Sequence, residues 1–347
     1  MPPPALGGSL GARSVFHRVG GTPRGPAGRP GPSSRPPGSP GPPGSPDTGP
    51  TAADSPYAGD VPSSASPSAA AARLTGRAAT GARPLSGAVT LVDLDDGRTV
   101  VVKHDEGAGA VRAEAAGLRW LAGAGAVRVP DVLGEEPYWL VTERVEEGPP
   151  GPRAAAGFGR ELAALHLAGA PALGSPPPGG PVEARIGLAP LRNATGDDWP
   201  RWYAEHRVLP YLRGAVDAGV LLSAEAAVVE RVCERLPALA GPAEPPARLH
   251  GDLWNGNVLW GTDGSVRLID PAAHGGHRET DLAMLRLFGC PYLEEVLAAY
   301  RERAPLADGW AGRVGVHQLF PLLVHAVLFG RGYAERAVAA AREALRG

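Results

Sequence analysis

The sequence is poor in several residue types, and each shortage argues against a class of protein. Its two cysteines, Cys233 and Cys290, lie far apart and outside any Cys-x-x-Cys or Cys/His cluster, which argues against a disulfide framework or a structural zinc site. The formal net charge is only −2, so no basic field directs the chain to nucleic acid or an anionic membrane. The longest apolar run, residues 319–330, is too short to cross a bilayer. The N-terminus lacks the pattern of a secretory signal. We therefore expect a cytoplasmic monomer without nucleic-acid or membrane partners.

Lysine and asparagine are rare in this sequence. Lys103 is the only lysine among 34 basic residues, and the only asparagines are Asn193, Asn255 and Asn257. The abundance of Ala, Gly, Pro and Arg indicates a coding bias that replaces lysine with arginine wherever either residue serves. A lysine retained against this bias is a candidate for a chemical role, with chance retention as the alternative.

The chain divides into three segments by composition and periodicity. Residues 1–70 are rich in Pro, Gly and Ser, which predicts a disordered extension. Residues 71–145 combine β-type stretches at 88–94, 99–103 and 138–145 with helical spacing over 110–122. Residues 146–347 are predicted to be mostly helical, except for 248–271, where short strands are expected at 258–260 and 266–269. The fold class is therefore α+β, with a small β-rich lobe before a larger helical lobe.

The strongest chemical signal is the segment LHGDLWNGNVLW, residues 249–260. It places Asn257 five residues after Asp252, and Asp270 follows thirteen residues later at the end of a predicted strand. This spacing is that of kinase-like catalytic loops, in which one carboxylate orients or deprotonates the attacking hydroxyl. Asp252 would be this base, and Asn257 and Asp270 would supply oxygen ligands to Mg²⁺. The alternative is a loop whose Asp, Asn and Gly only build turns.

Lys103 gains a role in the same scheme. It ends a predicted strand and precedes a helix that carries Glu114, an arrangement typical of the lysine and glutamate that serve ATP phosphates in kinases. Arginine is a poor substitute there because its planar fork differs from a compact ammonium. The segment from Glu143 to Val145 would then be the hinge whose backbone meets adenine. A surface Lys and Glu without function are the alternative.

The motif HGDLWNGN, followed by DPAAHGGHRETDLAMLRLFG, resembles the fructosamine/ketosamine-3-kinase family. This family belongs to the aminoglycoside-phosphotransferase and choline-kinase group with a bilobal, protein-kinase-like fold. The resemblance extends over roughly residues 75–345, through the segments EAAGL (114–118), RVPDV (128–132), FGRELAALH (158–166), IGL (186–188), DDWPRWY (197–203) and HQLFPLLVHAVLFGRGY (317–333).

The resemblance implies ATP- and Mg²⁺-dependent phosphorylation of the sugar 3-hydroxyl of a ketosamine, a small-molecule or protein-bound adduct, as a step in deglycation. It implies the same roles for the Asp252, Asn257, Asp270, Lys103 and Glu114 positions. Trp254, His277 and Arg278 are further candidates for contact with the substrate. Glu279 and Asp281 are expected to be structural, with Asp281 capping the following helix, and His166, His250 and His325 are expected to be packed.

Two segments depart from the family pattern. The glycine-rich loop of the family is shorter here, because Leu85-Ser86-Gly87 runs directly into the next predicted strand. The family's aromatic stretch DNYIG is replaced by EARIG, residues 183–187. Backbone amides of a glycine-rich loop normally cradle phosphates. Two alternatives therefore stay open: a kinase of an aminoglycoside, choline or another amino-alcohol, and a catalytically weakened pseudokinase.

Overall fold

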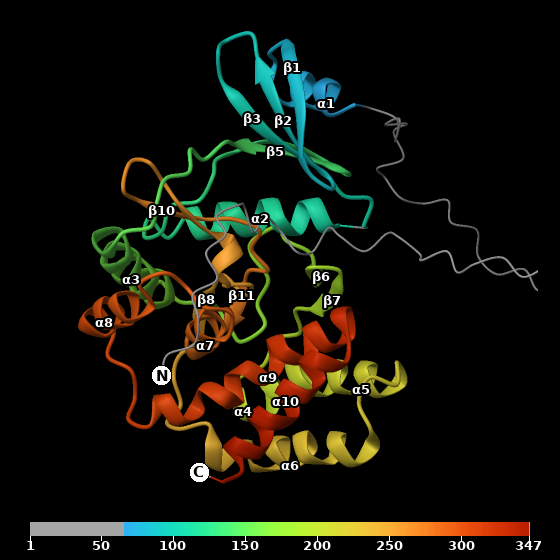
Figure 1. Cartoon of the computed structure of the whole chain (residues 1–347), viewed down its shortest axis with the longest axis vertical. Helices are drawn as coiled ribbons and strands as arrows, with labels where there is room; N and C mark the ends of the chain where they lie inside the picture. The colour runs from blue at the N-terminus through green and yellow to red at the C-terminus, as the bar shows by residue number, and fades with distance from the viewer. Residues whose placement is uncertain (1–65, 108, 347) are drawn as a thin grey trace, which may run out of the picture.

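The computed structural model describes residues 66–107 and 109–346, in two lobes (Figure 1). The predicted extension therefore lies, up to residue 65, outside the described residues. The first lobe is built on a five-stranded antiparallel sheet in the order β1-β2-β3-β5-β4. Its strands are β1 (Ala79–Ser86), β2 (Val89–Leu94), β3 (Thr99–His104), β4 (Val132–Glu136) and β5 (Trp139–Glu143).

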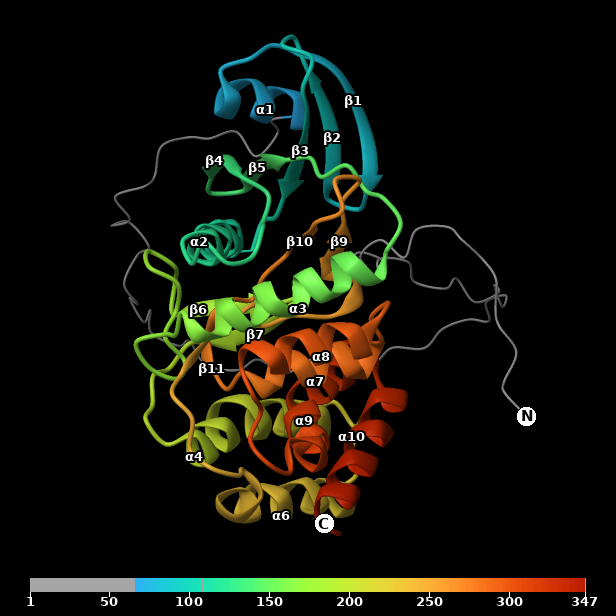
Figure 2. The ribbon, with the colours of Figure 1, turned by 90° about the vertical axis from the view of Figure 1, so that its left-hand side faces the viewer.

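Strand alternation gives this sheet two apolar faces. Val100 and Val102 of β3 pack with β5 and with helix α1 (Pro67–Thr75). Val101 and Lys103, the residues between and after them, therefore point to the opposite face, toward helix α2 (Ala110–Ala122) and the second lobe. Figure 2 shows the sheet between α1 and α2. This two-residue period is what aims Lys103 at the space between the lobes.

Helix α1 was not expected, because it begins inside the segment predicted to be an extension. Its sequence nevertheless carries helix signals. The Ser66 Oγ accepts a hydrogen bond from the Ala69 N–H at 3.2 Å, Pro67 starts the helix, and Gly76 ends it with a φ of 68°. Ala70 and Ala71 are fully buried against the sheet. Proline and serine thus mark a helix start here, and the first lobe begins earlier than expected.

The second lobe is mainly helical, as predicted, and comprises α3 (Pro152–Leu167), α4 (Trp199–Tyr203), a π-helical turn (Ala204–Val208), α5 (Leu209–Asp217), α6 (Ser223–Leu239), α7 (Glu279–Phe288), α8 (Leu293–Arg303), α9 (Trp310–Phe329) and α10 (Arg331–Ala344). Its short strands form three antiparallel pairs: β6 (Glu183–Ile186) with β7 (Ala189–Arg192), β8 (Ala247–Leu249) with β11 (His274–Gly276), and β9 (Val258–Trp260) with β10 (Val266–Leu268). The β9–β10 hairpin confirms the strands expected there.

The β6–β7 hairpin and β11 were missed because the sequence lacks a clear strand signal at either place. β6 and β7 have four residues each, several of them exposed, and β7 contains Pro190. β11 has three residues, two of them glycine. Short strands with proline or glycine resemble turns in sequence, so tertiary packing decides their conformation.

Helix α9 is longer than the apolar run that the sequence suggested. By length and composition it could cross a membrane, but 61% of its apolar window is buried inside the protein. It packs against α5, α7 and α10. Such burial is typical of the core helix of a packed lobe.

Cys233 and Cys290 are both free.

Helix α2 connects the two lobes. Its Leu118 packs with Leu140 of β5, whereas Trp120 and Leu121 join the core that includes Phe158 of α3. Burying each of these large side chains contributes about 1.5–3 kcal/mol. Residues of α2 that line the space between the lobes, Glu114 among them, are therefore held from both sides.

Candidate active site

The segment between β8 and β9 is held in shape by the buried ring of His250. Its Nδ1 accepts a hydrogen bond from the Asp252 N–H at 3.3 Å, and its Nε2 donates to the Ile269 carbonyl at 2.9 Å. Burial lowers the pKa of His250, so the neutral ring makes both bonds. Gly251 has a φ of 83°, and a Cβ there would lie 2.1 Å from the Ala272 carbonyl oxygen. Only glycine fits this turn.

Asp281 of α7 braces the same segment. Its carboxylate accepts hydrogen bonds from the His250 N–H at 2.8 Å and the Gly251 N–H at 3.0 Å, and lies 3.2 Å from His166 Nε2. Burial alone would raise the pKa of Asp281, but these hydrogen bonds lower it overall. The expectation that Asp281 caps its own helix was wrong, because its carboxylate reaches the neighbouring loop. His166, His250 and His325 are buried, as expected.

Asp252 and Asn257 form a pair at the end of this braced loop. The Asn257 Nδ2 donates to the backbone carbonyl of Asp252 at 2.8 Å and to its Oδ2 at 3.1 Å. The Oδ1 of Asp252 is buried and has no hydrogen-bond partner among the described residues. Burial, assisted by the charge of Asp270, raises the pKa of Asp252 to about 7. The loop thus presents one free carboxylate oxygen and leaves the Asn257 Oδ1 free as a ligand atom.

Lys103 approaches this loop from the first lobe. Its Nζ donates to Glu114 Oε1 at 2.6 Å and to Asp270 Oδ1. Burial would lower the pKa of Lys103, but the two carboxylates more than offset this and raise it. Asp270 has a φ of 54°, which is unusual for a residue with a Cβ. Lys103, Glu114 and Asp270, three of the residues predicted to bind ATP or the metal, therefore meet at one point between the lobes.

Two cavities meet at this point and share Lys103, Glu114 and Asp270 in their walls. The larger cavity, of about 670 Å³, is bounded above by apolar side chains of the sheet and below by residues of β9 and Ile269. Glu143 and Val145 lie in its wall. The Val145 N–H has no backbone acceptor among the described residues. A cavity between apolar side chains, beside a backbone N–H without an acceptor, suits a nucleobase.

The smaller cavity, of about 360 Å³, is lined by side chains of the loop that His250 and Asp281 hold in place. Asp252 and Asn257 line it, together with residues of the β3–α2 segment and the β6–β7 hairpin. Sequence reasoning did not assign a role to the hairpin residues Arg185 and Leu188, which also lie in this wall. The only sequence signal was the departure of EARIG from the family pattern.

Trp254 lies beside the base but lines neither of the two cavities described. Its ring meets Phe288 edge-on, with centroids 6.3 Å apart. It also covers Gly256, where a Cβ would lie 2.1 Å from a ring carbon. Trp254 therefore shapes the turn from Asn255 to Asn257, and its contact with a sugar stays a prediction.

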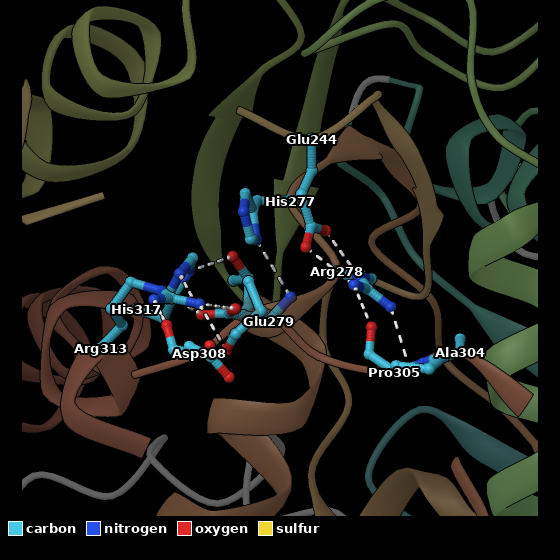
Figure 3. A network of polar contacts seen from close by, with 11 residues as sticks. Glu244, His277, Arg278, Glu279, Ala304, Pro305, Asp308, Arg313 and His317 are labelled. Atoms are coloured by element: carbon cyan, nitrogen blue, oxygen red, sulfur yellow. Dashed lines mark hydrogen bonds and ion pairs between the residues drawn. The ribbon is translucent and has the colours of Figure 1, made fainter. Parts of the chain in front are cut away.

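The structure does not bring His277 and Arg278 to either of the two cavities. Arg278 donates to Glu244 at 2.8 Å and to the Pro305 carbonyl at 2.8 Å, and His277 is buried beside Glu279 (Figure 3). Residues close to Asp270 in sequence thus turn away from it in space. Their position gives no support to the expected contact with substrate.

A buried polar cluster surrounds Glu279 at the start of α7 (Figure 3). The potential ligand atoms of His277, Glu279 and His317 lie within 4.8 Å of one another. However, Arg313 donates to both Glu279 oxygens, at 3.0 and 2.6 Å, and already balances their charge. We therefore interpret this cluster as an internal ion pair that joins α7 to α9.

The turn between β1 and β2 is as short as the sequence suggested. Ser86 pairs directly with Val89, so only Gly87 and Ala88 form the turn. Gly87 has a φ of 39°, which suits glycine at a tight hairpin. Ala88 of this turn lies in the wall of the smaller cavity, and the flanking Ser86 and Val89 lie in the wall of the larger one. A turn of two residues offers few amides to phosphate.

Comparison with known proteins agrees with this geometry. The sequence model of the fructosamine kinase family matches residues 70–346. A probable ketoamine kinase of Thermus thermophilus is 37% identical over 265 residues, covering 75% of this chain and 93% of the relative. A chloroplastic protein-ribulosamine 3-kinase of Arabidopsis thaliana is 30% identical, covering 67% of this chain and 71% of the relative. The crystal structure of a Thermobifida fusca protein assigned as a fructosamine-3-kinase has a TM-score of 0.76 and 49% identity, covering 81% of this chain and 98% of its own. With most of its described length matched and the expected two-lobe architecture present, the chain belongs to the fructosamine kinase family.

Proposed function

We propose that this chain transfers the γ-phosphoryl group of Mg²⁺·ATP to the 3-hydroxyl of the sugar in a ketosamine, as a step in deglycation. Its relatives are named ketoamine kinases and a ribulosamine 3-kinase, and the family match spans both lobes. The observation that carries the proposal is Asp252, which lines the same cavity as the Lys103–Asp270 pair and whose buried Oδ1 has no hydrogen-bond partner among the described residues.

The larger cavity is proposed to hold the nucleotide. Adenine would lie between the apolar side chains of the sheet and those of β9, with the Val145 N–H as its backbone donor. The triphosphate would then extend toward Lys103, whose orientation is fixed by Glu114. A compact ammonium held in this way can neutralise phosphate oxygens without blocking the passage between the cavities.

The residues present fit a magnesium ion. Asn257 has one free amide oxygen, Asp270 supplies a carboxylate, and both line the smaller cavity. Hard oxygen donors in small number suit Mg²⁺, which keeps several waters and also binds substrate phosphates. When bound, the ion would neutralise charge on the transferring phosphoryl group.

Asp252 would orient the sugar hydroxyl through its free Oδ1. In the transfer, the bond from the γ-phosphorus to the ADP oxygen breaks and a bond to the sugar oxygen forms. The hydroxyl proton passes to Asp252. The hydrogen bond from Asn257 keeps the other carboxylate oxygen in place, and the brace from Asp281 holds the backbone behind it. Positioning of this kind supplies most of the catalysis in phosphoryl transfer.

A screen of acceptors with purified protein tests the proposal. Fructosyl- and ribulosyl-amines should be phosphorylated, with the product identified by mass spectrometry. Asp252→Asn should lower kcat by about 10³-fold or more, while calorimetry shows ATP binding near the wild-type affinity. Asp217→Asn, at an exposed carboxylate that ends α5, is the matched control and should leave turnover unchanged.

Three outcomes would contradict the proposal. Turnover of an aminoglycoside or choline but of no ketosamine would change the acceptor class. Binding of Mg²⁺·ATP without any phosphorylated product would indicate a pseudokinase. Undiminished turnover in Asp252→Asn would remove the assigned base.

A further inference from the structure

The charges around the smaller cavity are unevenly paired. Lys103, one of the two permanently charged cations in its wall, is held by Glu114 and Asp270. The other, Arg185, makes no hydrogen bond or ion pair with any residue in 66–107 or 109–346. An unpaired guanidinium in the wall that also contains the base is placed to bind an anionic part of a ligand.

The fold keeps Arg185 away from partners of its own. Along β6 the side chains alternate, so Ile186 is buried in the helical core while Glu183 and Arg185 are exposed. Glu183 pairs with Arg192 across the hairpin at 3.2 Å. Arg185 lies opposite Pro190, which has no charge to offer. The pairing of β6 with β7 therefore gives Glu183 an ion-pair partner and leaves the charge of Arg185 available.

The position of the Arg185 head group is defined by the first lobe. A Cβ built on Gly107 would lie 2.7 Å from Arg185 Cζ and 2.8 Å from its Nη1. The guanidinium thus packs against the backbone of Gly107 in the β3–α2 segment, where any larger residue would displace it. Figure 1 shows the β6–β7 hairpin beside one end of α2. Arg185 therefore reaches across the space between the lobes.

Two further features of the cavity wall indicate which kind of ligand it would bind. The N-terminal residues Ala110 and Val111 of α2 line the same cavity, and the first turn of α2 has no acidic side chain and no side-chain cap, so its positive dipole end adds to Arg185. Asp105 and Glu106 also line the cavity. A lone anion would be repelled by these carboxylates, but a ligand carrying both a cation and an anion would match the mixed wall.

We propose that Arg185 binds the carboxylate of the acceptor, and that the acceptor is a ketosamine formed on the α-amino group of a free amino acid. Such a molecule carries a protonated secondary amine next to a carboxylate, which matches Asp105 and Glu106 beside Arg185. Leu188, 61% exposed at the hairpin turn and in the same wall, offers an apolar surface to the amino-acid side chain. This inference rests on the proposed function and adds the substrate class.

Steady-state kinetics with two matched acceptors tests this inference. Fructosyl-valine carries the carboxylate, whereas fructosyl-valinamide has the same shape without the charge, and each is also made with ribulose as the sugar. The wild type should prefer the carboxylate form by about 10- to 100-fold in kcat/KM, the range expected for a hydrogen bond to a charged group. Arg185→Ala should remove this preference by raising KM for the carboxylate form only, and Arg185→Lys should restore part of it.

Arg192→Ala provides the control, because Arg192 is an exposed arginine on the neighbouring strand and lies outside the wall of the smaller cavity. It should keep the wild-type preference. Equal turnover of the acid and the amide by the wild type would overturn the role of Arg185 while leaving the kinase proposal intact. An equal loss for both acceptors in Arg185→Ala would also overturn it. Failure of every ketosamine to react would overturn both proposals.

Discussion

Replacing Lys103 with methionine is the most informative perturbation of this protein. Methionine keeps most of the length and apolar stem of lysine but removes the charge. Glu114 and Asp270 would then face each other across the cleft without the ammonium that now binds both. We expect loss of folding stability together with loss of catalysis.

The structure sets the magnitude of the stability effect. Breaking a fully buried ion pair by removing one partner costs about 3–5 kcal/mol. The side chains here are 20% to 31% exposed, so water screens the remaining carboxylates and we expect about 2–3 kcal/mol. For a chain of this size that loss lowers Tm by about 4–12 °C. The difference in stability from wild type should shrink at acidic pH, because a protonated Glu114 no longer needs the cation.

Lys103→Arg separates charge from shape. It keeps the positive charge, so its loss of stability should be within about 1 kcal/mol. Its planar fork cannot replace the compact ammonium, so kcat/KM for ATP should fall by about 100-fold or more. Chemical denaturation and ATP-dependent turnover, measured on both variants, give the two effects independently.

A double-mutant cycle with Glu114→Gln provides the decisive check. If the ion pair exists in solution, the free energies of unfolding of the single and double variants should reveal a coupling of about 1 kcal/mol or more. A coupling below about 0.5 kcal/mol would refute the pairing. Wild-type turnover in Lys103→Arg would refute the idea that the compact shape of the ammonium, in addition to its charge, explains why lysine is retained at this position.

Two other variants probe the supporting structure. Asp281→Ala removes the acceptor of two buried N–H groups and should lower the free energy of unfolding by about 3 kcal/mol. It should also lower kcat more than it changes KM for ATP. An unchanged kcat would show that the loop does not need the hydrogen bonds from Asp281. Burial alone would raise the pKa of Glu279, but the neighbouring His317 and the two hydrogen bonds from Arg313 lower it to about 2. Since this value lies below the unfolded value of about 4.3, the carboxylate stabilises the fold above that pH and the benefit is lost as pH falls toward 2. Glu279→Gln should therefore be less stable than wild type at pH 7, with a Tm difference that narrows below about pH 4.3; a constant difference would contradict this assignment.

Local sequence signals were sufficient where a segment buries one continuous face. The helix predicted for residues 110–122 has those same bounds in the structure, because Val111, Ala115 and Leu118 all face apolar partners. The edge strand β1 was missed since it contains Gly81 and Pro84 and half of its residues are exposed. Its conformation depends on pairing with β2, which a local pattern does not contain.

The reactive groups of the site were predictable from spacing, whereas their supports were not. Asp252 and Asn257 belong to one loop, so a fixed separation in sequence implies proximity. Asp281 meets the loop from 31 residues away, and only the packing of α7 determines which way its carboxylate points. His277 shows the converse, because nearness to Asp270 in sequence did not bring it to the site.

The short turn between β1 and β2 explains why one lysine and a metal site must hold the phosphates in the proposed reaction. Gly87 and Ala88 provide the only backbone N–H groups of the turn, because Ser86 and Val89 already pair with each other. A longer loop would add amides without adding charge. In the proposed reaction, Lys103 would have to bind the phosphates that a longer loop would otherwise hold. Its replacement would then be restricted by geometry, even though arginine is preferred elsewhere in the sequence. The retention of one lysine and the shortness of the turn would therefore be two aspects of the same proposed phosphate site.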